Sequence, residues 1–138
     1  MILNRNQIIG AVKTIKAALG KDNDYYIKDG YIIAQNSESI AKVKVEGLSE
    51  NFRLPAKAIP LLSAMGEEIE AKITAGAISF KSGKSKANYK ITDIPDSLLD
   101  TGNFKGDHSI NIDSEIINNA VSKLFNIVAV NTTRPVLT

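Results

Sequence analysis

The first stretch of the chain with a clear hydrophobic pattern is residues 4–19, NRNQIIGAVKTIKAAL. Apolar side chains stand at positions 8, 12, 15 and 19, the spacing of one face of an α-helix. This spacing predicts an amphipathic helix that buries the stripe. Asn4 suits the start of the helix, because its side-chain oxygen can accept a free backbone N–H, and Gly20 suits the end.

The same pattern returns near the end of the chain. When the sequence is shifted by 109 positions, Asp113 takes the place of Asn4. The central apolar residues of the first helix then fall on apolar residues: Ile8 on Ile117, Val12 on Val121 and Ile15 on Leu124. We therefore expect a repeated unit, with one domain over residues 1–107 and the incomplete start of a second over residues 108–138. A chance match is the alternative, since amphipathic helices resemble one another.

Between the two copies the pattern is typical of antiparallel strands. Asp29-Gly30 separates two β-forming stretches, residues 25–27 and 31–33, and this dipeptide indicates a hairpin turn. Further strands are expected at residues 40–45, 51–54, 68–73, 77–81 and 84–91. Clean alternation of apolar and charged residues over 68–73 places one face of that strand inward.

A second helical stretch covers residues 55–65. Pro60 conflicts with a helix interior, so this helix is either kinked or begins later than Pro55. Residues 96–107 read as a linker, followed by an extended stretch at 110–112 and the repeated helix. The order predicts an α+β fold: two helices packed on antiparallel sheet, then the first strand and helix of a second copy.

Composition limits the classes of protein that fit this pattern. The chain has 138 residues, 43% of them hydrophobic and 23% charged, as in a globular domain. It has no apolar run long enough to cross a bilayer and no signal-peptide pattern at its start. It also lacks cysteine, which excludes disulfides and thiolate chemistry. These features favour a cytoplasmic protein without membrane contact.

The charge distribution says more than the net charge of +2. Residues 1–21 carry four cations and no acid: Arg5, Lys13, Lys16 and Lys21. The first helix is therefore locally positive. Lys13 and Lys16 are three residues apart, so they share a face away from the apolar stripe. An ordinary solvated helix face is the alternative interpretation.

The sequence offers little for catalysis. His108 is the only histidine and stands in a polar linker, and Ser82-Gly83-Lys84-Ser85 lacks the upstream glycine of a phosphate loop. We expect no catalytic residue, no metal and no cofactor. An enzyme with an acidic site at Asp93 and Asp96 remains the least favoured alternative.

Three motifs in order resemble one protein family. They are Leu54-Pro55-Ala56-Lys57, then Ser82-Gly83-Lys84-Ser85-Lys86 with Ile94-Pro95-Asp96, then Thr133-Arg134-Pro135-Val136-Leu137-Thr138. Together they are similar to motifs of the bacterial DNA polymerase III β subunit, the sliding clamp. The resemblance covers domain one and the start of domain two. It also accounts for the repeat, because these clamps are built from copies of one domain.

The resemblance implies a DNA-clamp-like fold and a non-enzymatic processivity factor. Such clamps form a ring, here a homodimer, that encircles duplex DNA without sequence specificity and serves a replicative DNA polymerase and a clamp loader. Lysines on the inner helices attract phosphates. The DNA-facing candidates here are Arg5, Lys13, Lys16, Lys21 and Lys57.

Two protein-binding surfaces follow from the same resemblance. Arg134 and Leu137 match positions that border the groove for polymerase peptides. The subunit interface of the ring uses the edge of domain one near the strand leading into residues 94–99, with Leu98 and Leu99 as apolar contacts. Ordinary core packing of these leucines is the alternative.

A function of another class also fits this sequence. A clamp-derived module can bind protein through an open sheet edge, with neither ring formation nor DNA binding. The two functions differ in DNA affinity at low salt, which only the sliding clamp predicts.

Overall fold

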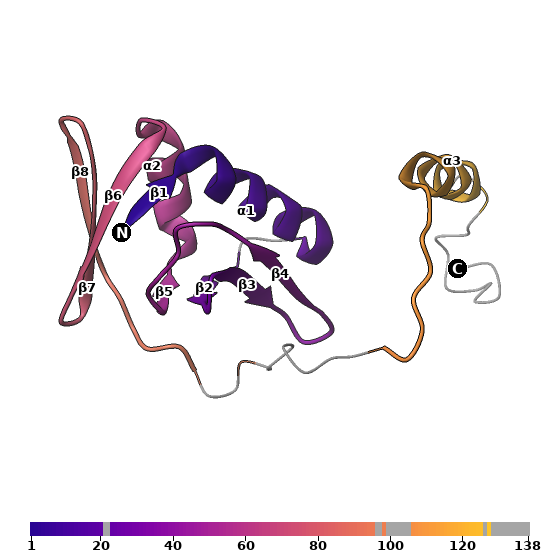
Figure 1. Cartoon of the computed structure of the whole chain (residues 1–138), viewed down its shortest axis with the longest axis horizontal. Coiled ribbons are helices and arrows are strands. Elements are labelled where there is room, and N and C mark those ends of the chain that lie inside the picture. Colours follow the sequence, from indigo (N-terminus) through magenta and orange to yellow (C-terminus); the bar gives the residue numbers. More distant parts are fainter. Residues whose placement is uncertain (21–22, 96–97, 99–105, 126, 128–138) are drawn as a thin grey trace. The chain divides into compact units, whose positions relative to one another are not determined.

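The computed structural model describes residues 1–20, 23–95, 98, 106–125 and 127 (Figure 1). The chain divides into two compact units, Met1–Asp100 and Thr101–Thr138, and each is described by itself. The described part of the first unit contains two four-stranded antiparallel sheets and two α-helices.

Helix α1 (Arg5–Leu19) is the predicted first helix. Asn4 caps it, with its Oδ1 accepting the N–H of Gln7 at 3.1 Å. The helix ends at Gly20, whose φ of 83° suits glycine and whose N–H donates to the Lys16 carbonyl at 2.8 Å. Its predicted stripe is buried, as Ile8, Ala11, Val12 and Ile15.

One sheet has the strand order β4-β3-β2-β5 and lies under α1 (Figure 1). Its strands are β2 (Tyr25–Lys28), β3 (Tyr31–Gln35), β4 (Ile40–Lys44) and β5 (Phe52–Leu54). The predicted Asp-Gly hairpin joins β2 to β3, with Asp29 at φ 52° and Gly30 at φ 83°. β3 and β4 also pair antiparallel, so β2, β3 and β4 lie side by side in the order of the sequence.

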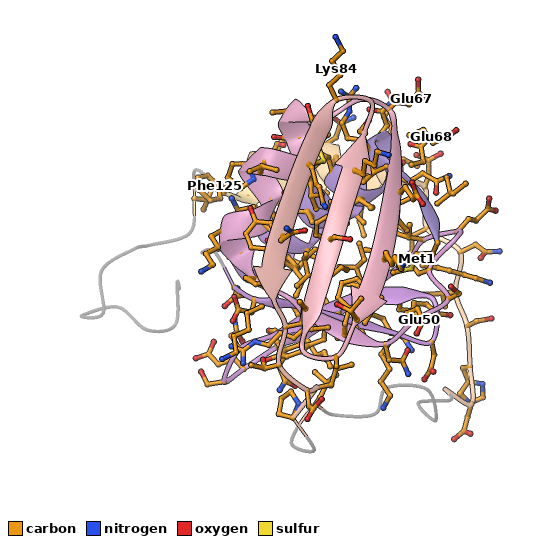
Figure 2. All side chains as sticks on the ribbon, turned by 90° about the vertical axis from the view of Figure 1, so that its left-hand side faces the viewer. Met1, Glu50, Glu67, Glu68, Lys84 and Phe125 are labelled. Carbon is orange, nitrogen blue, oxygen red and sulfur yellow. The ribbon has the colours of Figure 1, made fainter. Side chains whose placement is uncertain are left out.

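The other sheet has the order β1-β6-β7-β8. It combines the N-terminal strand β1 (Ile2–Asn4) with a meander of β6 (Glu68–Thr74), β7 (Ala77–Ser82) and β8 (Ser85–Lys90). Ser82 pairs with Ser85, so the SGKS stretch is a tight turn between strands. Figure 2 faces this sheet, with Lys84 at the tip of the β7–β8 turn.

Pro60 sets where the second helix begins. A short 3₁₀-helix, η1 (Ala56–Ala58), precedes helix α2 (Ile59–Ala64), so Pro60 stands in the first turn of α2. A first-turn residue has no intrahelical partner for its N–H, which proline lacks. Of the two predicted alternatives, the later start is therefore the observed one.

A continuous core joins the two sheets and both helices. Its largest fully buried side chains are Leu3, Ile15, Tyr25, Ile27, Ile32, Leu62, Ile69, Ile78 and Phe80. They come from every layer of the first unit. The described part of the chain has no buried charged side chain, so apolar packing holds these layers together.

The start of α1 is fixed to the sheet beside it. Asn4 has two roles: it pairs with Glu68 in the β1–β6 ladder, and its side chain caps α1. The next residue, Arg5, donates its backbone N–H to the Glu67 carbonyl at 2.8 Å and a guanidinium N–H to the Met65 carbonyl at 2.7 Å. The angle between β1 and α1 is therefore determined by hydrogen bonds on both sides of the junction.

The loop after β4 covers the outer edge of β1. Met1 and Ala71 exchange backbone hydrogen bonds, so the alternate residue Ile2 directs its backbone groups away from β6. Gly47 lies against this edge, where a Cβ atom would be 2.7 Å from the Ile2 carbonyl oxygen. The approach requires glycine and closes this side of the sheet.

The described part of the second unit contains helix α3 (Ser114–Phe125), the predicted repeat of α1. Asp113 caps it, its Oδ1 accepting the N–H of Glu115 at 2.8 Å. The predicted strand over residues 110–112 is not formed. Its counterpart β1 is held by β6, and no strand is present among the described residues of the second unit to pair with it.

We predict that Gly47→Ala destabilises the protein more than Gly76→Ala. Both glycines have a positive φ, 83° and 77°, so alanine costs each roughly 1 kcal/mol in backbone strain. Only at Gly47 does the new Cβ also collide with backbone, which should raise the total to about 3 kcal/mol. Urea unfolding of both variants measures the difference, and equal losses would contradict the contact with β1.

Candidate nucleic-acid interface

The face of α1 opposite its buried stripe is polar and positively charged. Lys13 and Lys16 are both exposed on it, and the whole helix Arg5–Leu19 contains no acidic residue. The buried stripe fixes the rotation of the helix about its axis. Both lysines are therefore held on the outside of the unit, where a polyanion can approach.

Arg5 has contacts within the protein. Besides its bond to Met65, its Nε and Nη2 donate to the Asn6 Oδ1 at 3.3 and 3.2 Å, and the residue is half-buried. The bond to Met65 joins the start of α1 to the end of α2. Arg5 therefore has a structural role in addition to its predicted role towards DNA.

The remaining predicted residues fall into three groups. Lys57 is exposed on η1. Leu98 is buried, with 7% of its surface exposed, and its N–H donates to the Pro95 carbonyl at 3.0 Å. This burial favours packing within the unit over contact with a partner subunit. The others lie outside the described residues: Lys21, Leu99, Arg134 and Leu137.

Near Lys57, an ion pair connects three elements. Asp24, just before β2, accepts hydrogen bonds from Nε of Arg53 at 3.0 Å and from its Nη2. The second carboxylate oxygen of Asp24 accepts the N–H of Ala56 at 3.0 Å, at the start of η1. The Arg53 guanidinium also lies 5.9 Å from the ring centre of Tyr26 on the neighbouring strand.

The pair changes the acidity of both groups. Burial alone would raise the pKa of the Asp24 carboxyl, but the Ala56 N–H, the hydrogen bonds from Arg53 and the charges of Arg53 and Lys57 outweigh it. The pKa of Asp24 is therefore below its ordinary value. The hydrogen bond to Asp24 raises the pKa of Arg53.

Sequence reasoning missed this pair. Asp24 and Arg53 are 29 residues apart and meet only because β2 pairs with β5, which sets Tyr26 opposite Arg53. The available signal was a lone arginine in a short strand directly before the Leu-Pro-Ala-Lys motif.

The described residues contain no group of three His, Cys, Asp or Glu side chains arranged to hold a metal ion. Asp93 and His108 are exposed, and Asp96 lies outside the described residues. Among the helices that the structure describes, none combines the length and apolar character that crossing a membrane requires.

Two antiparallel sheets with helices on one side and a basic outer helix face define an α+β domain of clamp type. The chain is similar to the β subunit of DNA polymerase from Streptococcus pyogenes, with a TM-score of 0.75 and 17% identity over 99% of this chain. It is also similar to the DNA polymerase III β subunit from Thermotoga maritima (TM-score 0.68, 20% identity, 94% of this chain) and to the DNA polymerase sliding clamp from Bacillus subtilis (0.69, 13%, 99%). These similarities confirm the predicted α+β fold and the resemblance of that fold to sliding clamps.

The chain spans about two fifths of these structures, 42% of the S. pyogenes subunit and 40% of the T. maritima subunit. One further similar structure, the Helicobacter pylori β clamp, was solved bound to a DNA ligase peptide (TM-score 0.59, 12% identity, 95% of this chain). No family description and no curated protein matches the sequence. The similarity is therefore one of fold.

We predict that Asp24→Asn lowers stability at neutral pH by about 1 kcal/mol, since the pair is partly exposed and screened by solvent. Because the folded-state pKa of Asp24 is depressed, its contribution is present above the unfolded pKa of about 3.9 and is lost as pH falls through the folded pKa. Urea unfolding should therefore give different free energies of unfolding for the variant and the wild type at pH 7, and similar ones in acid. The control Glu50→Gln changes an exposed loop carboxylate and should leave the pH dependence unaltered.

Proposed function

We propose that this chain is part of a sliding clamp, a non-catalytic processivity factor that encircles duplex DNA without reading its sequence and tethers a replicative polymerase. The observation that carries the proposal is the basic outer face of α1 in a fold that matches a DNA polymerase β subunit over 99% of this chain. Polymerase and clamp loader are its expected partners. The cytoplasm is its expected location.

The proposed grip on DNA is electrostatic and topological. Lys13 and Lys16 supply charge on flexible side chains, without the fixed geometry that reads base edges. Contacts of this kind release counterions, so affinity falls steeply with salt. Enclosure by the ring then keeps the protein on DNA while it slides.

A subunit contact made by strand pairing requires an open sheet edge, and β8 offers one. Among the described residues β8 pairs only with β7. The Ile91 N–H donates to the Gly76 carbonyl at 3.0 Å, so the alternate residues of β8 direct their N–H groups to the open edge: Lys86, Asn88 and Lys90. This is the strand that leads into residues 94–99, where the interface was expected.

We also propose that the second unit begins another copy of the first, with the boundary near residue 107. The apolar stripe of α3 is exposed, whereas the equivalent stripe of α1 is buried. A second domain would supply the layer that covers α3. A clamp-derived module that binds protein through an open sheet edge, with neither ring formation nor DNA binding, is the alternative, and the open edge of β8 is the feature that favours it.

DNA binding by α1 is tested with a Lys13→Gln and Lys16→Gln double variant. Titration of a fluorescent DNA duplex at several low salt concentrations should show weaker binding, with a salt dependence reduced by roughly two ion equivalents. The charge-matched control, Lys72→Gln with Lys81→Gln, alters exposed residues of β6 and β7 and should bind as the wild type does. No DNA affinity in the wild-type chain at low salt would favour the module.

Ring closure is tested with Asn88→Pro in a protein long enough to close the ring. Proline removes an edge N–H without removing a bond to β7, so the fold should persist while the subunit contact weakens. The wild type, once loaded, should stay on closed circular DNA and dissociate when the circle is cut. The variant should dissociate from closed and from cut circles. Equal loss of the wild type from closed and cut circles would contradict the topological grip.

A further inference from the structure

A pocket of about 420 Å³ lies where β5, η1 and the end of β8 meet. Three cationic side chains line it, each from a different element: Arg53 from β5, Lys57 from η1 and Lys90 from β8. One carboxylate, that of Asp24, is also in the lining. These residues are far apart in sequence, so it is the fold that brings their positive charges together.

Arg53 is held rigidly at this pocket. Its Nε and Nη2 donate to Asp24, and its Nη1 donates to the Thr92 hydroxyl at 3.4 Å. A guanidinium has five N–H groups, so these three bonds leave two for a ligand. Little side-chain entropy remains to be lost when a ligand binds.

Asp24 offsets only one of the three positive charges at the pocket. One of its oxygens accepts both bonds from Arg53, and the other accepts the Ala56 N–H. Neither Lys57 nor Lys90 forms an ion pair with another described residue, and both are exposed. The three cations and one carboxylate leave an excess of two positive charges at one pocket.

We infer that this pocket binds a phosphate group. An arginine fork and two lysines can together engage three oxygens of a phosphate, whereas a carboxylate offers only two. Arg53 supplies two free N–H groups, and Lys57 and Lys90 supply two further positive charges in the same lining. Pro55 and Ala56 provide a small apolar wall beside it.

A phosphate can come from the backbone of nucleic acid or from free phosphate. The pocket itself is independent of the proposed function, because its own cations define it. Only the nucleic-acid source rests on that function. In that case Lys57 acts with Arg53 and Lys90 at a defined site, separate from the diffuse attraction by Lys13 and Lys16.

The test is a titration of the full 138-residue chain with inorganic phosphate at constant ionic strength, followed by amide NMR. We expect saturable shifts at Ala56, Lys57 and Thr92. The Lys57→Gln and Lys90→Gln double variant should bind phosphate about tenfold more weakly. The charge-matched control, Lys81→Gln with Lys84→Gln, changes residues outside the pocket and should stay within about twofold of the wild type.

A DNA duplex added to the same sample identifies the source. Shifts at the same amides that phosphate reverses assign the pocket to the nucleic-acid backbone. Phosphate binding without a DNA effect there assigns it to free phosphate. Shifts that do not saturate, or equal weakening in both double variants, would overturn the site. If the Lys13 and Lys16 double variant loses DNA affinity and the Lys57 and Lys90 double variant does not, the proposed function is supported without the phosphate pocket.

Discussion

Burial of one stripe of α1 is the interaction on which the rest of the first unit depends. Ile8, Ala11, Val12 and Ile15 pack into the core that joins both sheets, and this fixes the rotation of the helix. A helix with a single apolar stripe must expose the rest of its surface. The basic face is therefore a consequence of packing: the same contacts that stabilise the fold hold Lys13 and Lys16 outward.

In the described part of the second unit, the corresponding helix has its apolar stripe exposed. Ile117, Val121 and Leu124 match the buried stripe of α1 but are 43%, 58% and 58% exposed. An isolated helix of this length gains little stability from its own hydrogen bonds, and α3 is capped by Asp113. The repeat in sequence is thus preserved in local structure, while the packing that would complete it is not present among the described residues.

Sequence pattern predicted most elements because their signals are local. Asp29-Gly30 indicated its hairpin, alternation over 68–73 indicated β6, and Pro60 correctly restricted the start of α2. Contacts between distant residues were beyond reach. The Asp24–Arg53 pair and the pocket beside it depend on the pairing of β2 with β5, and the closeness of Gly47 to β1 depends on a loop conformation. The strand expected at 110–112 failed because a strand needs a partner that its own residues do not specify.

The contact of Gly47 with β1 makes the two margins of this sheet different. One margin is sealed by the chain itself, and the opposite margin ends in β8, whose outward N–H groups are unpaired within the described sheet. Copies cannot stack end to end through both margins of this sheet, so an unlimited fibre built by strand addition alone is blocked at β1. Pairing of two copies through β8 would leave this sheet without a second open margin, so strand addition at this sheet would end with the pair.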